Sequence, residues 1–519
     1  MTEIYSLKGE SCMNRRMSGV LLSYTLLFVD IVVGVVFVPF LLGGLGEGEY
    51  GLYKLMHSTA SYLSVLDFGI GATITRYVVK YRTEGRKNEE MNFVAMGLIV
   101  YGILAGAVVL LGTGIGVFIP HIYAQSIAPT QMRYAQLLFL MICLNTAVNL
   151  FNHAYSGLIT AYERFTYSQL ANILKVLLRT GLIVVSVSLH PTALIVAGVD
   201  LMLSMMMLAV NMFYTRFSMQ CRIRLHRWDK GLLKEAFVFT TAVLLQSIIN
   251  QFNSNVDNIV LGIFTTTSIV AMYSVALQLF TMYSTLSTVV SSVYLPTISR
   301  AVFRGADDDQ ITKAVIGPSR IQLVVLLLAL SGFILYGRHF ITLWVGAAYI
   351  EVYVLATVLM TAATLELSQN TITSVLKAKN ILHGKTLILM ISTLVNAVIT
   401  ILLVPVWGAM GAAAGTTFSM IFGYGIGLNI YYQKKAGLNM RMYYRETYAG
   451  ILMAAAVAIV PGLGIGYLVR NDGIFGFILK AGIYVCVYGV VMLFVGLNPG
   501  EKQMARRLFQ KVLGKINRA

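Results

Sequence analysis

Long apolar runs recur from one end of this 519-residue chain to the other, and they limit what it can fold into. Each run is long enough for a helix to cross a hydrocarbon core of about 30 Å at about 1.5 Å per residue. Only 12% of the residues are charged and the mean hydropathy is +0.75, as expected for a chain that lies mostly in lipid. Short polar loops separate the runs without regular strand-length alternation, which favours helices over a barrel. The sequence therefore predicts an all-α polytopic membrane protein.

The apolar runs predict fourteen transmembrane helices. They are expected at 17–43, 50–79, 91–119, 131–160, 167–189, 192–217, 233–264, 267–299, 314–343, 350–377, 384–404, 408–433, 444–469 and 474–496. Lysine and arginine resist translocation, so they test this division. Most of the 39 lysines and arginines fall on the cytoplasmic side of the membrane if the N-terminus is placed in the cytoplasm. The chain is thus expected in the cytoplasmic (inner) membrane, with both termini in the cytoplasm.

The net charge of +17 is explained by these cytoplasmic lysines and arginines, because basic loops orient the chain and suit an anionic inner leaflet. No nucleic-acid partner is needed to account for it. The four cysteines have no paired spacing, so neither a disulfide framework nor a metal site is indicated. No cofactor is predicted, although proton or sodium coupling stays open.

Catalytic motifs are missing from the sequence. No serine-histidine-aspartate set, phosphate loop or His-Glu-x-x-His occurs at a credible spacing, so the chain is not expected to be an enzyme. Asp67-Phe68-Gly69 matches a protein-kinase tripeptide, but the other kinase motifs are missing. A membrane glycan polymerase would need a large outer loop, and the longest expected here is about 120–130.

Polar side chains recur at helical spacing within four of the apolar runs. One such stripe is explained equally well by hydrogen bonding between packed helices. Four stripes together favour a shared water-filled cavity, because polar faces avoid lipid. The predicted substrate-cavity residues are Arg179, Lys175, Asn145, Asn149, Asn152, His153, Gln246, Asn250, Asn253, Gln278, Glu366 and Gln369.

Ionisable residues inside the runs indicate either transport or pairing, since an isolated charge in lipid is costly. Counting along two neighbouring helices places Arg179 and Asp200 at nearly the same depth, so they can form an ion pair. Structural pairing is the expected role of Asp200, whereas Asp30, Lys175 and Arg179 are expected to serve transport. The predicted coupling or gating residues are Asp30, Lys54, Asp67, Arg76, Asp200 and Asp257.

The segment Leu66–Tyr77 places an aspartate, two glycines and an arginine at the end of the second expected helix. Asp67 lies about 25 Å along that helix, near its cytoplasmic end. We expect Gly69 and Gly71 to permit a bend or a close helix contact. Asp67 is expected to pair with a basic neighbour at an inner gate.

Several short motifs follow one another along the chain. The first are GEYGL at 48–52 and the Leu66–Tyr77 segment, and later ones are at 255–262 (NVDNIVLG), 273–276 (YSVA), 343–346 (LWVG) and 405–413 (PVWGAMGAA). In this order they resemble the polysaccharide-transport (Wzx-type oligosaccharide flippase) branch of the multidrug/oligosaccharidyl-lipid/polysaccharide exporter superfamily. They cover most of the chain.

The resemblance implies two six-helix lobes, 1–220 and 221–440, related by a pseudo-twofold axis around a V-shaped cavity. A helix pair at 441–498 and a basic cytoplasmic tail at 499–519 would follow. The resemblance also implies a transporter that flips a polyprenyl-pyrophosphate-linked oligosaccharide from the inner to the outer leaflet by alternating access, for surface polysaccharide biosynthesis. Membrane lipids are expected partners, with a polysaccharide polymerase and glycosyltransferases as further candidates.

Two other transporters of the same superfamily stay open. A cation-coupled multidrug exporter would favour an acidic cavity, whereas Lys175 and Arg179 suit an anionic cargo. A lipid II flippase carries arginines in its first helix, and this chain has none between Arg16 and the loop that follows that helix.

Overall fold

The computed structural model describes residues 2–469 and 473–503 of the chain. Within them, only the backbone is described for residues 2–21, 24, 232–239 and 241–243. Helices make up nearly all of this described part, and no strand occurs in it, so the all-α prediction is confirmed. The chain forms two compact units, Met1–Ser274 and Val275–Ala519. The lobe boundary expected at residue 220 stays a prediction.

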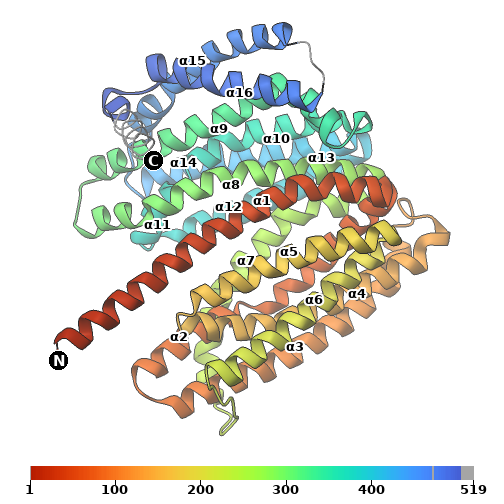
Figure 1. Ribbon diagram of the computed structural model, residues 1–519, viewed down its shortest axis with the longest axis vertical. Coiled ribbons are helices and arrows are strands. Elements are labelled where there is room, and N and C mark those ends of the chain that lie inside the picture. The colour runs from red at the N-terminus through yellow and green to blue at the C-terminus, as the bar shows by residue number, and fades with distance from the viewer. Residues whose placement is uncertain (1, 470–472, 504–519) are drawn as a thin grey trace. The chain divides into compact units, whose positions relative to one another are not determined.

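The first unit contains seven helices and the start of an eighth (Figure 1). These helices are α1 (Thr2–Ser61), α2 (Ile70–Thr83), α3 (Lys87–Ile122), α4 (Met132–Ala161), α5 (Phe165–Leu189), α6 (Ala193–Phe213), α7 (Lys230–Phe264) and α8 (Thr267–Phe303). Short 3₁₀ or π segments are η1 (Tyr62–Asp67), η2 (Pro129–Gln131) and η3 (Tyr214–Ser218).

The second unit contains the rest of α8 and the helices that follow it. These helices are α9 (Asp308–Trp344), α10 (Glu351–Ser368), α11 (Ile372–Ala378), α12 (Leu382–Trp407), α13 (Ala409–Ser419), α14 (Leu428–Lys434), α15 (Met440–Leu468) and α16 (Ile474–Val491). The short segments are η4 (Ala347–Tyr349), η5 (Met420–Gly427) and η6 (Met492–Gly496).

Eleven segments of the described chain are long and apolar enough to cross a membrane. One of them, Thr25–Thr83, holds two of the expected spans, because Gly46 (φ 78°) interrupts the helix between them. Two more expected spans, 233–264 and 408–433, coincide with α7 and with the continuous segment from α13 to α14. Each of the expected ranges therefore falls on helical segments, although 50–79 is broken between η1 and α2 and 350–377 is divided between α10 and α11. The protein is a multi-pass membrane protein.

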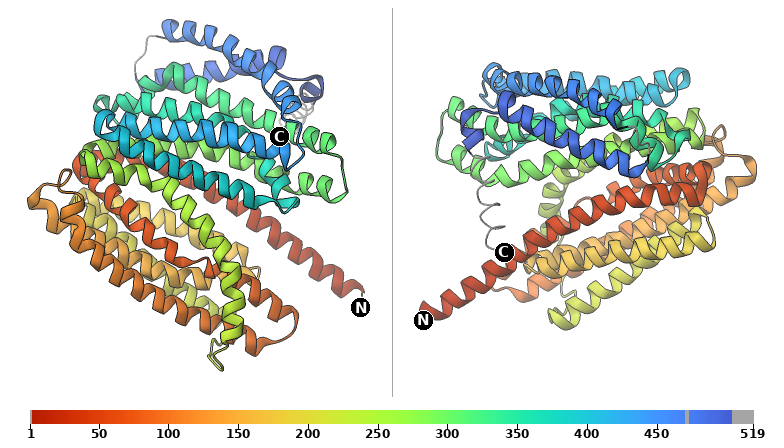
Figure 2. Two further views of the ribbon diagram at one scale, coloured as in Figure 1. Left: turned by 180° about the vertical axis from the view of Figure 1, so that it is seen from behind. Right: turned by 45° about the horizontal axis from the view of Figure 1, so that its top comes forward.

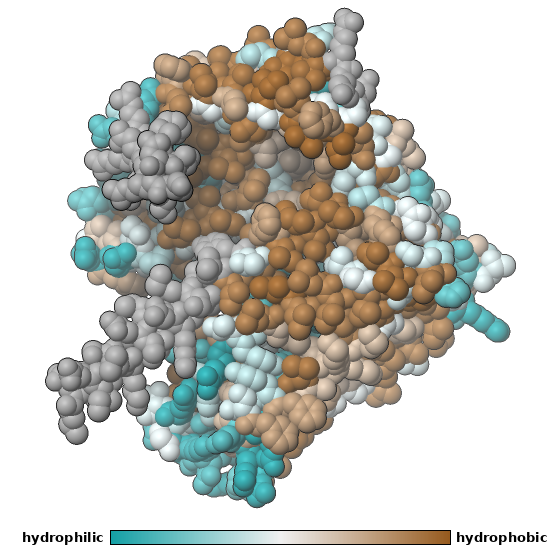
Figure 3. Space-filling model, in the orientation of Figure 1, coloured by the Kyte–Doolittle hydropathy of each residue, from teal (hydrophilic) through white to brown (hydrophobic). Residues whose placement is uncertain are grey.

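Helix α4 lies at the centre of the helix packing in the first unit. It packs against α2, α3 and α6, while α5 packs against α1 and α6. Figure 1 shows α3, α4, α5 and α6 running side by side. Hydrophobic side chains cover the middle of these helices, and hydrophilic ones gather at the bottom of the view, over the α2–α3 and α6–α7 loops (Figure 3). This distribution is the one a membrane span requires.

The Leu66–Tyr77 segment breaks the second expected helix and brings two backbones together. Segment η1 ends at Asp67, Phe68 and Gly69 adopt left-handed φ values of 52° and 68°, and α2 then begins. A Cβ atom on Gly157 of α4 would lie 2.4 Å from the carbonyl oxygen of Gly71 on α2. The Thr75 hydroxyl donates a hydrogen bond to the Gly157 carbonyl at 3.0 Å. Both the expected bend and the expected close helix contact are present.

The C-terminal helix pair packs on α9 (Figure 2). Arg320 of α9 is 3% exposed, and its Nε atom lies 2.6 Å from Oε1 of Glu501. Its other nitrogens donate hydrogen bonds to the backbone carbonyls of Glu446 and Gly496. One buried guanidinium thus fastens α15 and η6 to α9. Of the expected tail at 499–519, residues 499–503 are described and residues 504–519 lie outside the described part of the chain.

The contact between Gly71 and Gly157 predicts a position-specific effect of a single methyl group. We expect Gly157→Ala to destabilise the protein by about 1–3 kcal/mol, because the added Cβ would overlap a backbone oxygen that cannot rotate away. Thermal unfolding of the purified protein in detergent would measure the loss. Gly114→Ala in α3 is the matched control, since a Cβ there meets no atom within 4 Å. Equal melting temperatures for the two variants would contradict the packing described here.

Candidate functional site

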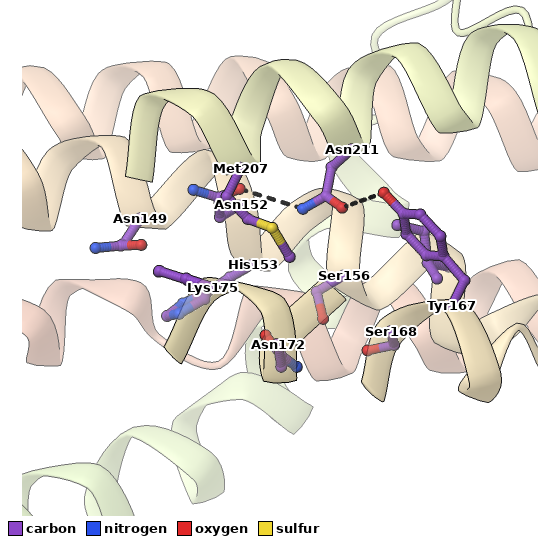
Figure 4. Close-up of a pocket in the computed structure, with 11 residues that line it drawn as sticks. Asn149, Asn152, His153, Ser156, Tyr167, Ser168, Asn172, Lys175, Met207 and Asn211 are labelled. Atoms are coloured by element: carbon purple, nitrogen blue, oxygen red, sulfur yellow. Dashed lines mark hydrogen bonds between the residues drawn. The ribbon is translucent and has the colours of Figure 1, made fainter. Parts of the chain in front are cut away.

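A polar hollow of about 160 Å³ lies among α4, α5 and α6 of the first unit (Figure 4). Two helical stripes face it, one from α4 and one from α5. The residues that line it are Asn149, Asn152, His153, Ser156, Ile159, Tyr167, Ser168, Asn172, Lys175, Met207 and Asn211. The structure therefore brings together four of the twelve predicted cavity residues, namely Lys175, Asn149, Asn152 and His153. Asn145 of α4 does not line the hollow, but its carbonyl accepts a hydrogen bond from the Asn149 amide at 3.0 Å.

A chain of hydrogen bonds forms one wall of the hollow and links all three helices. The Asn152 amide donates to the Ser204 carbonyl of α6 at 3.0 Å, and the Asn211 amide donates to Asn152 Oδ1 at 3.3 Å. The Tyr167 hydroxyl donates to Asn211 Oδ1 at 3.0 Å. Tyr167 also stacks on Tyr214, with ring centroids 3.5 Å apart. These bonds hold the amides in place, as buried polar groups require.

The opposite wall carries side chains that face the hollow from α4 and α5. Ser168, Asn172 and Lys175 follow one another at steps of four and three on α5, and Ser156 lines the hollow from α4 (Figure 4). Lys175 is half-buried, and none of the described side chains that line the hollow is acidic. The site therefore combines hydroxyl and amide groups with one ammonium group, which suits a hydroxylated or anionic ligand.

Arg179 lies one turn beyond Lys175 and forms the predicted ion pair with Asp200. Its Nε and Nη2 atoms lie 2.5 Å and 2.9 Å from the two carboxylate oxygens, a bidentate arrangement. The Tyr53 hydroxyl of α1 also donates to Asp200, at 3.1 Å. Arg179 is not among the residues that line the hollow, so Lys175 is the cation at its wall. The transport role expected for Arg179 stays a prediction.

His153 connects the hollow to the Leu66–Tyr77 segment. Its Nδ1 atom lies 3.3 Å from Oδ1 of Asp67, and the Tyr101 hydroxyl of α3 donates to the same oxygen at 2.5 Å. Asp67 thus has the basic neighbour that was expected, supplied by α4. Asp67, the last residue of the 3₁₀ segment η1, therefore positions a residue of the site. Its role in an inner gate stays a prediction.

The other predicted coupling residues occupy separate places in the first unit. Asp30 is exposed on α1, and Arg76 is exposed on α2. Lys54 is half-buried, with its Nζ atom 5.4 Å from the centroid of the Tyr50 ring. Asp257 of α7 is 3% exposed and accepts a hydrogen bond from the Tyr273 hydroxyl at 2.6 Å. Their coupling or gating roles stay predictions.

The remaining predicted cavity residues do not line this hollow. On α7, the Gln246 amide donates to Asn250 at 3.1 Å, and Asn253 is exposed. In the second unit, Gln369 is buried and donates to Asn429 at 3.1 Å and to the Tyr444 hydroxyl at 2.7 Å, which joins α10 to α14 and α15.

Gln278 on α8 and Glu366 on α10 are half-buried. They belong to the second unit, whereas the hollow described above lies wholly in the first. A chamber shared by the stripes of both units stays a prediction.

Several residues of the site were not predicted from the sequence. Asn172 lies at helical spacing between Ser168 and Lys175, and Asn211 follows an apolar run of α6. An amide within a span is a signal that could have found both. Tyr167 and Tyr53 carried no such signal, because tyrosine is common throughout these helices.

A family model described as "Polysaccharide biosynthesis protein" matches residues 17–302, more than half of the chain. This range contains α2 to α7, and with them the whole polar hollow. A protein of Haloferax volcanii described as "Probable flippase AglR" is 25% identical over 410 residues. That alignment spans 75% of this chain and 78% of the archaeal protein.

Solved structures show the same fold. The lipid II flippase MurJ in an inward closed conformation has a TM-score of 0.70 at 16% identity, covering 92% of this chain and 98% of that one. An inward-facing multidrug resistance MATE family transporter of the MOP superfamily has a TM-score of 0.65 at 13% identity, covering 81% and 96%. At these identities the likeness shows a common architecture.

The Arg179–Asp200 pair predicts an energetic coupling between α5 and α6. We expect Arg179→Gln and Asp200→Asn each to destabilise the protein by about 2 kcal/mol, because each leaves the other charge without its partner. The side chains are 31% and 17% exposed, so solvent moderates the loss. The double variant should be more stable than the sum of the single losses predicts. Unfolding measurements on all four proteins test this, and strictly additive losses would contradict it.

Proposed function

Because this chain belongs to the polysaccharide biosynthesis protein family, we propose that it flips a polyprenyl-pyrophosphate-linked oligosaccharide from the inner to the outer leaflet by alternating access. The motif resemblance to polysaccharide exporters agrees with the matched family, and the archaeal relative is described as a probable flippase. The observation that carries the proposal is the hollow among α4, α5 and α6, with its amides, hydroxyls and Lys175.

The chemistry of the hollow matches a glycan attached to a phosphate. Amides such as Asn149 and Asn172 can donate to and accept from sugar hydroxyls, which replaces the water that those groups lose. The ammonium group of Lys175 can screen a pyrophosphate oxygen by a charge-assisted hydrogen bond. The isoprenoid chain stays in the bilayer, where it is already solvated.

The size of the hollow indicates that it receives one part of the cargo. A volume of about 160 Å³ is below the roughly 300–1,000 Å³ of pockets that enclose a drug-sized ligand, so it is too small for a whole oligosaccharide. We assign it to a single sugar ring or to the phosphate group beside Lys175. His153, fixed by Asp67, borders the same space and ties its shape to the break between η1 and α2.

An anionic cargo also suits the energetics of the inner membrane. A potential that is negative inside assists outward movement of negative charge by about 2.3 kcal/mol per charge for each 100 mV. A cation-coupled drug exporter would instead need acidic groups at its binding surface, and the described lining residues include none. Cytoplasmic termini, proton or sodium coupling, and contact with a polysaccharide polymerase and glycosyltransferases belong to the same proposal.

Removal of the ammonium group at the hollow should impair transport. We expect Lys175→Gln to slow export about tenfold to a hundredfold, because a hydrogen bond to a charged group contributes about 1.5–3 kcal/mol. Lys175→Arg should retain part of the activity, since it keeps the charge. The measurement is movement of a fluorescent polyprenyl-pyrophosphate oligosaccharide across proteoliposomes.

Lys435→Gln is the matched control, because it removes the same charge from an exposed position after α14. It should transport as the unaltered protein does. Full transport by Lys175→Gln, with normal insertion and stability, would overturn the assignment of the hollow to the cargo.

A further inference from the structure

A second, larger hollow of about 800 Å³ lies at the loop end of the first unit. It is formed where the start of α3 meets η3 and the segment that follows α6. Four cationic side chains line it, namely Lys87, Arg216, Arg222 and Arg224, together with His226. None of the described residues at its wall is acidic. A hollow lined by charges of one sign concentrates the electric field and attracts anions.

An apolar hollow of about 440 Å³ adjoins the basic one. Met212 and Phe213 of α6 contribute to it, with Tyr155 of α4 at its wall. Arg216 and Phe217 line both hollows, so the charged space and the apolar space share part of their wall. A ligand that fits both must carry an anionic group next to a hydrocarbon chain. That description is the chemistry of an anionic lipid.

The loop that supplies the arginines is held in a defined position. Asn92 of α3 accepts hydrogen bonds on Oδ1 from the backbone N–H groups of His226 and Arg227, at 2.6 Å and 3.0 Å. Its amide donates back to the Arg227 carbonyl at 2.8 Å. The buried Cys221 donates its backbone N–H to the Thr215 carbonyl at 3.0 Å. The cationic side chains therefore extend from a fastened loop.

The apolar hollow lies on a different side of α6 from the proposed cargo site. Met207 and Asn211 face the polar hollow, and Asn211 is only 4% exposed. Met212 and Phe213, the next residues along the helix, are 47% and 64% exposed. A ligand on this side contacts the outer surface of α6. This position favours a lipid that stays in the leaflet over the molecule that is transported.

We propose that the two hollows together bind one phospholipid with an anionic headgroup. The phosphate lies among Arg216, Arg222 and Arg224, where charge-assisted hydrogen bonds are available. One acyl chain follows Met212 and Phe213 along α6. The bound lipid holds the inner end of α6 and its π segment η3 at the level of the headgroups. This inference is independent of which cargo the protein carries.

Lipid titrations of the delipidated full-length protein in detergent, followed by native mass spectrometry, test the proposal. Phosphatidylglycerol should bind about tenfold or more tightly than phosphatidylcholine with the same acyl chains, since each basic residue near a surface adds to the attraction. R216Q/R222Q/R224Q should remove that preference. Phe217→Ala should weaken binding of both lipids while the cations remain.

R300Q/R304Q/K313Q is the matched control, because it removes the same charge from exposed positions in the second unit. It should bind phosphatidylglycerol as the unaltered protein does. Thermal unfolding in the absence of lipid checks that R216Q/R222Q/R224Q is folded. If this triple variant does not fold, the single variants Arg222→Gln and Arg224→Gln replace it. Each should lower the affinity for phosphatidylglycerol about threefold.

Three results would overturn the proposal. An equal loss of phosphatidylglycerol binding in R300Q/R304Q/K313Q would show that any basic surface of the protein attracts this lipid. Displacement of the lipid by millimolar inorganic phosphate would show a simple anion site without a chain-binding part. Preferential binding of a polyprenyl pyrophosphate, lost in R216Q/R222Q/R224Q, would assign the hollows to the cargo.

Discussion

Polar groups inside a hydrocarbon core must find partners within the protein, and this constraint organises the first unit. The backbone meets it by forming helices, and the side chains meet it by turning toward other helices. Asn152, Asn211 and Tyr167 bond to one another and to the Ser204 carbonyl. These hydrogen bonds pair the three side chains with one another and with the backbone. The neighbouring amides Asn149 and Asn172 and the ammonium group of Lys175 line the hollow beside them. The same requirement that makes the fold helical thus produces a place for a hydrophilic ligand.

The break between η1 and α2 couples backbone packing to this site. Left-handed φ values at Phe68 and Gly69 end one helix and redirect the next, and the contact between Gly71 and Gly157 then sets the distance between α2 and α4. Asp67 precedes the break and reaches His153, which borders the hollow. A change in the angle at this break would therefore move a residue of the site. Breaks in spans near a binding site are a common arrangement in transporters.

Two cationic regions of the first unit have different surroundings. Lys175 borders a small hollow among amides and hydroxyls, while Arg179 beside it is paired with Asp200. At the loop end, several arginines gather beside exposed apolar side chains of α6. The first setting suits a ligand that enters and leaves, because a single charge binds it moderately. The second suits a lipid that remains, because several charges and an apolar surface act together.

The sequence by itself determined the helical class and the approximate places of the spans, and it showed that Arg179 and Asp200 lie at depths that allow them to pair. Apolar length and residue depth follow from the rise of a helix, which is the same in every protein. It did not determine that Lys175 and not Arg179 borders the hollow, or that Tyr167 and Asn211 complete its wall. Those facts depend on how each helix is rotated and which neighbour it meets. Rotation is decided by contacts between distant residues, such as Gly71 with Gly157, and only the tertiary structure contains them.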